Sequence, residues 1–236
     1  MKGNLTMKTI GILGGMSTAS SQLYYQTLCA LTQAQLGGLH SPNLLLRSLD
    51  FAPIADRMNR GDWAGIADVL NGEARQLQQA GAELIVLATN TMHKLADEMM
   101  AGVNLPLVHI ADATADAILS TPCRRPAFFA TRFTMEERFY LDIMEARGIK
   151  ALIPDADQRQ TINQIIFEEL CRNEVRPQSE TAYLEIVETL KDRGADSVIL
   201  GCTEVCLLLN AENTGLPVFD TTRIHCEAAL KAALSG

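Results

Sequence analysis

The sequence lacks the features that mark nucleic-acid-binding and membrane-spanning proteins. Its 236 residues include 20 Lys and Arg against 28 Asp and Glu, which leaves a formal charge of −8, and there is no dense basic run. A negative chain repels phosphate backbones, so no nucleic-acid partner is expected. The longest apolar runs, such as residues 84–88 and 198–200, fall far short of the roughly 20 residues that cross a bilayer. No membrane partner is expected either.

The cysteines also lack the spacing of a disulfide framework or a zinc site. No CxxC pair occurs among Cys29, Cys123, Cys171, Cys202, Cys206 and Cys226. The N-terminus has no apolar signal-peptide stretch, and residues 1–6 are expected to form a loose tail. These observations predict a cytoplasmic protein with no metal site. Its 47% hydrophobic content is enough for one large core or for two domains of roughly 100 residues each.

A short pattern is present twice in the chain. A Gly-Ala-acid turn precedes an apolar run at residues 81–88 and again at residues 194–201. Eight residues past the glycine, the first copy carries the hydroxyl of Thr89 and the second carries the thiol of Cys202. The duplication predicts two equivalent strands that end in inequivalent side chains.

Strands and helices are expected to alternate along the chain. Apolar runs typical of strands are found at residues 8–16, 43–49, 84–88, 107–110, 127–130, 151–154, 197–200 and 218–219. Helices are expected at about residues 17–35, 63–80, 92–100, 111–119, 161–171, 181–193 and 224–234, and one more after a loop at 131–134. Parallel strands need helical crossovers, so this order predicts parallel sheets. The strands show no alternation, as expected when both faces are covered.

Because the strand and helix cycle restarts after residue 112, we predict an α/β fold with two similar parallel-sheet domains. The first covers residues 7–112 and the second residues 113–221, and the C-terminal helix at 222–236 is expected to pack back on the first domain.

Ligands of open α/β sheets collect beyond the carboxyl ends of the strands, where Thr89 and Cys202 are expected. Each is followed by residues that open a helix or turn, so main-chain N–H groups could hold a carboxylate. The same environment is expected to lower the pKa of Cys202. A cleft between the domains would then offer one side chain to each face of a small acid, which suits inversion at a carbon bearing hydrogen.

Plainer interpretations exist for the cysteines and for Thr89. A cysteine after an apolar strand is commonly a small buried filler, and Cys29, Cys206 and Cys226 are assigned to that role. Thr89 alone could be a turn or cap residue, and the duplication could be only a repeated fold unit.

Three other features also have a plain alternative. His93 could serve as a base or merely cap and pack, and Met16 could belong to the core or to a cleft. The glycines at residues 11–15 suggest a dinucleotide site. However, the GxGxxG spacing is absent, and Asp50 lies 36 residues past Gly14 where about 20 are expected.

Several segments resemble the aspartate/glutamate racemase family, whose cofactor-independent enzymes are similar to hydantoin racemases, maleate isomerases and arylmalonate decarboxylases. The resemblance covers nearly the whole chain and rests on residues 8–17, 89–93, 201–204 and 217–221. It implies a pseudo-twofold pair of domains with the active site between them, an amino-acid substrate, no cofactor and a homodimer. It also implies catalytic roles for Thr89 and Cys202. Asn90, Thr91 and Thr203 would bind the substrate α-carboxylate and amine, while Met16, Thr131 and Thr134 would line the cleft.

Two departures from the family pattern shape the expected chemistry. Thr89 replaces the usual first thiol, as in a subgroup with a Thr/Cys pair. We therefore expect the Cys202 thiolate to abstract the α-hydrogen, from the L form by analogy, and Thr89 to protonate the opposite face. Cys171 stands where strict aspartate racemases are expected to carry a lysine, so uncharged amino acids could also be substrates. The alternatives are a single-thiol decarboxylase of the arylmalonate type, a maleate-type isomerase, and a non-catalytic carboxylate-binding module.

Overall fold

The computed structural model describes residues 7–172 and 174–235, so the expected N-terminal tail lies outside the described residues. The chain divides into two compact units. The first unit comprises Met1–His109 and His225–Gly236, and the second comprises Ile110–Ile224. The sequence-based domain boundaries, residues 7–112 and 113–221, remain a prediction.

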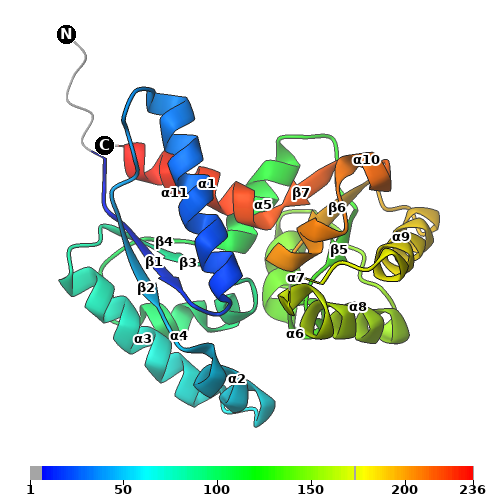
Figure 1. The fold of residues 1–236 in the computed structure, drawn as a ribbon, viewed down its shortest axis with the longest axis horizontal. Coiled ribbons are helices and arrows are strands. Elements are labelled where there is room, and N and C mark those ends of the chain that lie inside the picture. Colours follow the sequence, from blue (N-terminus) through cyan, green and yellow to red (C-terminus); the bar gives the residue numbers. More distant parts are fainter. Residues whose placement is uncertain (1–6, 173, 236) are drawn as a thin grey trace. The chain divides into compact units, whose positions relative to one another are not determined.

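The first unit is built on a sheet of four parallel strands in the order β2-β1-β3-β4 (Figure 1). These strands are β1 (Ile10–Gly14), β2 (Leu44–Ser48), β3 (Leu84–Leu87) and β4 (Leu107–Val108). The central strands β1 and β3 are buried along their whole length, as expected for strands covered on both faces. The edge strand β2 differs, because Leu46 remains 43% exposed.

Helices cover both faces of this sheet. On one face, α1 (Thr18–Leu36) and the last helix α11 (Thr221–Leu234) supply Tyr24, Leu28 and Leu230 to a core with Ile12 and Val86. On the other face lie α2 (Phe51–Asn59), α3 (Trp63–Gln79), the 3-10 helix η1 (Thr91–Leu95) and α4 (Ala96–Met100). Burying each large apolar side chain stabilises the fold by about 1.5–3 kcal/mol. The helices packed on the two faces of the sheet therefore keep the strands, and the residues at their ends, in fixed positions.

The second unit is built on three parallel strands in the order β5-β6-β7. They are β5 (Pro126–Phe129), β6 (Ser197–Leu200) and β7 (Val218–Asp220). Leu152 forms a single parallel bridge with Ala127 of β5, which is all that the structure shows of the strand expected at residues 151–154. With that bridge counted, the strand order of the second unit repeats that of the first.

Helices and stacked aromatic rings complete the second unit. Phe128 stacks on Tyr140 with ring centroids 4.7 Å apart, and Phe129 stacks on Tyr183 at 5.8 Å. The parallel α/β fold expected from the sequence is therefore confirmed. The helices are α5 (Ile110–Leu119), α6 (Arg132–Glu136), α7 (Arg138–Ala146), α8 (Ala156–Glu168), η2 (Leu170–Arg172), α9 (Pro177–Asp192), η3 (Thr203–Leu207) and α10 (Ala211–Thr214).

Three helices differ from the prediction for identifiable local reasons. Helix α2 has no counterpart among the expected helices, and its Pro53 lies in the first turn, where it removes no helical hydrogen bond. Helix α8 begins at Ala156 rather than near 161, since Asp155 and Gln158 form a capping box. The expected loop at 131–134 is mostly the first turn of α6.

Candidate active site

In the first unit, the glycine turn after β1 brings Met16 to the carboxyl end of the sheet. Gly15 has a φ of +91°, and a Cβ there would overlap main-chain atoms of Leu49. The Gly15 N–H donates to the Ser21 hydroxyl over 2.7 Å. Close main-chain packing thus accounts for this glycine without a dinucleotide. Met16 is 7% exposed and packs in the core of this face.

Thr89 lies at the same edge, two residues past β3, where the main chain is held by side-chain donors. Its carbonyl oxygen is 2.7 Å from Nδ1 of His93, and the preceding carbonyl of Ala88 accepts a hydrogen bond from Ser20 Oγ over 3.1 Å. Thr89 itself is partly exposed, whereas Asn90 and Thr91 are each 8% exposed. The three adjacent residues expected at the site therefore occupy a fixed turn into η1.

The structure resolves the open interpretation of His93. Its ring is buried within the unit, close to the rings of His109 and His225. Burial, together with the two neighbouring histidines, lowers the pKa of His93 well below its usual value. The ring is neutral at neutral pH, and its Nδ1 is engaged with the Thr89 main chain.

In the second unit, the parallel register of β5 and β6 places Thr131 and Cys202 at one edge. Phe129 pairs with Leu200, and Thr131 and Cys202 each follow two residues later. The hydroxyls of Thr131 and Thr134 are 3.0 Å apart, and Thr134 is buried. Thr203, partly exposed, begins η3 directly after Cys202.

The thiol of Cys202 has an acidic partner that the sequence analysis did not assign. Cys202 Sγ donates to Glu204 Oε2 over 3.1 Å, and the Glu204 side chain belongs to a residue only 8% exposed. The only signal in the sequence was an acid two residues past the thiol. Glu204 is thus a further candidate site residue.

The expectation that the pKa of Cys202 is lowered is wrong. Burial raises the pKa of this thiol well above its usual value, and the Glu204 carboxylate raises it further. A hydrogen bond from the Glu204 main-chain N–H lowers it only in part. Helix η3 is a five-residue 3-10 helix, too short for a strong dipole. At neutral pH Cys202 rests as a thiol.

Cys171 lies on η2, next to η3, and interacts electrostatically with the same pair. Burial raises the pKa of Cys171 to about 11, and the Glu204 carboxylate contributes. Cys171 in turn raises the pKa of Cys202. The position that we compared with a family lysine is therefore occupied by an uncharged thiol beside the Cys202–Glu204 pair.

The other cysteines only partly match the expected role of buried filler. Cys226 is buried in the core of the first unit, which confirms that role. Cys206 is partly buried and packs against the core of the second unit, so its role as a filler holds only in part. Cys29 is partly exposed and is not a buried filler.

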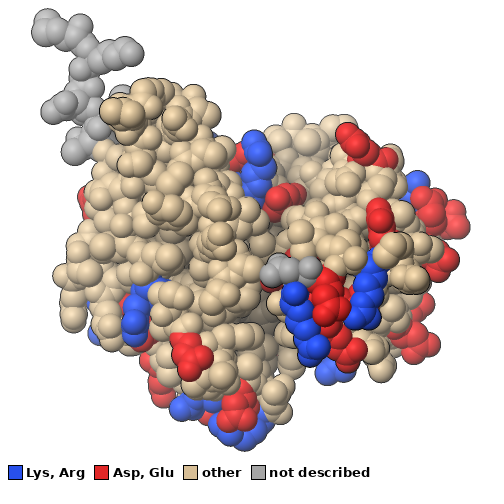
Figure 2. Space-filling model, in the orientation of Figure 1, with Lys and Arg blue, Asp and Glu red and all other residues tan. Residues whose placement is uncertain are grey.

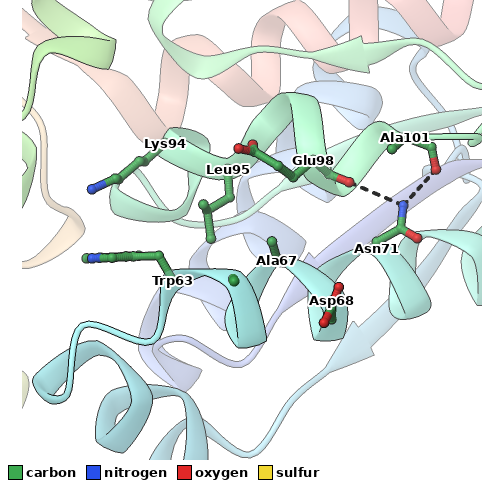
Figure 3. A pocket seen from close by; sticks show the side chains of 9 residues that line it. Trp63, Ala67, Asp68, Asn71, Lys94, Leu95, Glu98 and Ala101 are labelled. Carbon is green, nitrogen blue, oxygen red and sulfur yellow. Dashed lines mark hydrogen bonds between the residues drawn. The ribbon is translucent and has the colours of Figure 1, made fainter.

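A pocket of about 500 Å³ lies on the first unit between α3 and the η1–α4 segment (Figure 3). Lys94 Nζ lies 4.3 Å above the centre of the Trp63 ring. Asn71 donates to the carbonyls of Glu98, Met99 and Ala101, which closes the end of α4. None of the expected site residues lines this pocket, and its contacts are accounted for by helix packing.

Within residues 7–172 and 174–235, no three His, Cys, Asp or Glu side chains are arranged to hold a metal ion. In the same residues, every helix is too short or too polar to cross a membrane.

The fold places the chain in a class first: it is a two-unit α/β protein with a hydroxyl side chain, Thr89, and a thiol, Cys202, at the carboxyl ends of parallel strands. The family description "Asp/Glu/Hydantoin racemase" matches residues 13–229. The chain belongs to this family of racemases and is therefore an isomerase.

Individual relatives agree with the family assignment. The chain is 24% identical over 232 residues to the broad specificity amino-acid racemase RacX of Bacillus subtilis, covering 96% of this chain and 98% of that protein. Among solved structures, a provisionally described Asp/Glu racemase from Yersinia pestis is 44% identical with a TM-score of 0.92, covering 97% of this chain and 100% of that one. PH1733 from Pyrococcus horikoshii, an aspartate racemase homologue, is 32% identical with a TM-score of 0.85, covering 96% and 99%.

Proposed function

We propose that the protein is a cofactor-independent amino-acid racemase that inverts the α-carbon by two-base chemistry. The observation that carries the proposal is the thiol–carboxylate pair of Cys202 and Glu204 at one strand end, 3.1 Å apart, with Thr89 at the equivalent strand end of the repeated design. The two domains are proposed to cover residues 7–112 and 113–221, and each contributes one of the two catalytic residues.

The proton transfers balance as follows. Glu204 accepts the Cys202 proton to give a thiolate and a neutral carboxyl group. The thiolate takes the α-hydrogen of the L enantiomer, and the electron pair of the broken bond moves into the α-carboxylate. Thr89 Oγ donates its proton to the opposite face, and the threonine hydroxyl is restored by a proton from water. The hydroxide so formed takes the proton of the Glu204 carboxyl group, which returns the enzyme to its resting state. Neutralisation of the substrate carboxylate by nearby donors is essential, because an amino-acid α-hydrogen is a very weak acid.

The binding roles follow the positions of the polar side chains. Asn90, Thr91 and Thr203 are proposed to hold the α-carboxylate and amine, because each lies within two residues of a proposed catalytic residue, at the start of a 3-10 helix. Met16, Thr131 and Thr134 are proposed to contact the substrate.

The substrate is proposed to be aspartate, glutamate or a broader set of amino acids. The groups that raise the pKa of Cys202 are Glu204 and Cys171, and neither offers a positive charge to a distal carboxylate. RacX, a relative described as a broad specificity racemase, supports the broader set.

The proposed function is tested by incubating the protein with L-aspartate, L-glutamate and neutral amino acids in D2O, with EDTA and without pyridoxal phosphate. Loss of the α-hydrogen signal with formation of the D enantiomer is expected. Carbon dioxide release from an arylmalonate, or maleate-to-fumarate conversion without amino-acid exchange, would support the alternative reactions. Thermal stabilisation by amino acids with no turnover would support a binding module.

We further propose that the protein is a cytoplasmic homodimer, and that its dimer surface is a charge-free face of the first unit. Residues 9–46 contain no Asp, Glu, Lys or Arg, so all charged residues of a chain of net charge −8 lie elsewhere. The described surface over α1 accordingly shows no charged side chain (Figure 2). We call the exposed residues of α1, the 37–43 connection and residues 44–46 of β2 the charge-free face; Arg47, which pairs with Glu73, lies outside it.

Large apolar side chains are exposed on this face. Tyr25 of α1 is 50% exposed, Leu39 is fully exposed, and Leu46 of the edge strand β2 is 43% exposed. Depletion of charge with exposed aromatic and apolar side chains is typical of interface cores, and an exposed sheet edge favours pairing. A second copy also carries a charge of −8, and a face without charged side chains lets two copies meet without local repulsion. With no Lys or Arg, it has nothing to attract an anionic membrane.

The dimer surface is tested by light scattering coupled to size-exclusion chromatography. The wild type is expected to run as a dimer and Leu39→Glu with Tyr25→Glu as a monomer. The matched control is Phe167→Glu, a 42% exposed residue of the second unit, which should leave the dimer intact. A monomeric wild type, a dimer that survives the double substitution, or binding of the wild type to lipid vesicles would overturn the proposal.

A further inference from the structure

The main chain at Thr89 is held by a buried imidazole whose protonation state follows from its partner. Nδ1 of His93 lies 2.7 Å from the Thr89 carbonyl oxygen. A carbonyl oxygen can only accept, so Nδ1 must carry the hydrogen. Since the ring is buried and neutral, His93 is fixed as the Nδ1–H tautomer.

A second histidine next to it is fixed in the opposite tautomer. Nε2 of His225 lies 2.6 Å from the Val108 carbonyl oxygen and therefore carries the hydrogen. Its Nδ1 then accepts a hydrogen bond from the Tyr24 hydroxyl over 2.7 Å. Burial lowers the pKa of His225 to about 4, so this ring too is neutral at neutral pH.

The two rings and His109 form one packed group. The centroid of His93 lies 4.6 Å from that of His109 and 5.6 Å from that of His225. Each contact is edge to face, which restricts the rotation of the His93 ring. Through the hydrogen bond between Tyr24 and His225, the group joins α1 and α11 to η1, whose His93 contacts the Thr89 carbonyl two residues past β3.

We propose that His93 is a positioning residue that fixes the Thr89–Asn90 peptide and so aims the Thr89 hydroxyl; this inference rests on the proposed role of Thr89. The peptide is planar, and its carbonyl and N–H point in opposite directions. Holding the carbonyl toward a buried ring therefore fixes both the direction of the Asn90 N–H and the rotation of the chain at Thr89. A displacement of about 1 Å at a catalytic group can cost on the order of 100-fold in rate.

The choice of a histidine has a physical reason. The donor must reach a buried carbonyl, and a charged lysine or arginine would need a counter-charge in this apolar surrounding. A neutral imidazole supplies one N–H donor without a net charge, and its flat ring packs against the two other rings.

The activity test compares two substitutions of His93. In His93→Asn the amide nitrogen lies close to the position of Nδ1 and can still donate to Thr89, whereas His93→Leu has no donor. We expect kcat to fall about 100-fold in His93→Leu with little change in KM, and to recover to within about fivefold of wild type in His93→Asn. Equal losses in both variants, or no loss in His93→Leu at unchanged Tm, would overturn the proposal.

A second measurement does not depend on catalysis. Long-range ¹H–¹⁵N spectra of the intact protein report which ring nitrogen of each histidine carries the hydrogen. The expected result is Nδ1–H for His93 and Nε2–H for His225, each identified by loss of its signals in His93→Asn and His225→Asn. An Nε2–H tautomer at His93 would overturn the positioning role even in an active racemase. A wild type that exchanges no amino acid while showing the expected tautomers would instead remove the proposed function.

Discussion

The ends of β3 and β6 share the same sequence pattern, but different groups are hydrogen-bonded at the two ends. After β3 the main chain is fixed: donors from Ser20 and His93 hold the carbonyls of Ala88 and Thr89. After β6 the side chain is engaged instead, because the Cys202 thiol donates to Glu204. A repeated strand and turn therefore provides equivalent positions without providing equivalent acids and bases.

The two strand ends also differ in the charge of the group next to the proposed catalytic side chain. The imidazole behind Thr89 is kept neutral by burial and by two neighbouring histidines. The group beside Cys202 is a carboxylate that disfavours the thiolate. In the proposed reaction, Cys202 with Glu204 removes the weakly acidic α-hydrogen. Thr89 only donates a proton, which requires that its hydroxyl be accurately positioned.

The largest expected effect comes from removing the thiol at the β6 end. Cys202→Ala should reduce α-hydrogen exchange in D2O by about 10⁴-fold, since the base is lost. Cys206→Ala, four residues further on and outside the proposed site, should stay within about threefold of wild type. An active Cys202→Ala protein would overturn the assignment of the base.

The next effect concerns the hydroxyl at the β3 end. Thr89→Val keeps the shape of the side chain but has no proton to donate, so kcat should fall by about 100-fold or more. Thr89→Ser restores the hydroxyl and should recover most of the activity. If the valine variant were as active as the serine variant in steady-state assays, Thr89 would be only a turn residue.

Glu204→Gln tests the difference in charge between the two strand ends, because it replaces the carboxylate beside Cys202 with a neutral amide. Removing the like charge lowers the pKa of Cys202, so its alkylation by iodoacetamide, followed by mass spectrometry of the Cys202 peptide, should begin at lower pH than in the wild type. The racemisation kcat should nevertheless fall about tenfold, because the amide cannot accept the thiol proton. An unchanged alkylation profile would show that burial alone sets this pKa.

The smallest expected effect is on specificity. Cys171→Lys introduces a positive charge beside the Cys202–Glu204 pair and should lower KM for aspartate and glutamate about tenfold relative to alanine, as expected for one charged hydrogen bond. Cys171→Ala serves as the control and should leave that preference unchanged. Equal preferences in the two variants would place the substrate side chain elsewhere.

Much of the fold was predictable because it depends on local patterns. Unbroken apolar runs identified β1, β3, β5 and β6, and helical spacing identified α1 and α3. The prediction was less accurate where a local capping interaction sets the end of a helix, as at Asp155 and Gln158 at the start of α8. The strand expected at residues 151–154 is reduced to a single bridge at Leu152, since strand pairing depends on distant neighbours.

The candidate site was predictable only as far as residue type and position along a strand. Duplication identified Thr89 and Cys202, but the direction of the Cys202 pKa shift was wrong. The sequence pattern suggested a helix dipole, whereas burial and Glu204 dominate. The role of His93 was also hidden, because its partner is a main-chain carbonyl and its neighbours His109 and His225 are distant in sequence.

The most direct test of this asymmetry is to measure kcat and KM separately for both directions of racemisation of one amino acid. Racemisation has an equilibrium constant of one, so kcat/KM must be equal in the two directions, and any inequality of the bases appears in kcat and KM individually. We predict that the two kcat values of the wild type differ by about tenfold or more, and that Thr89→Cys brings them closer together. Equal kcat values in the wild type would contradict the account.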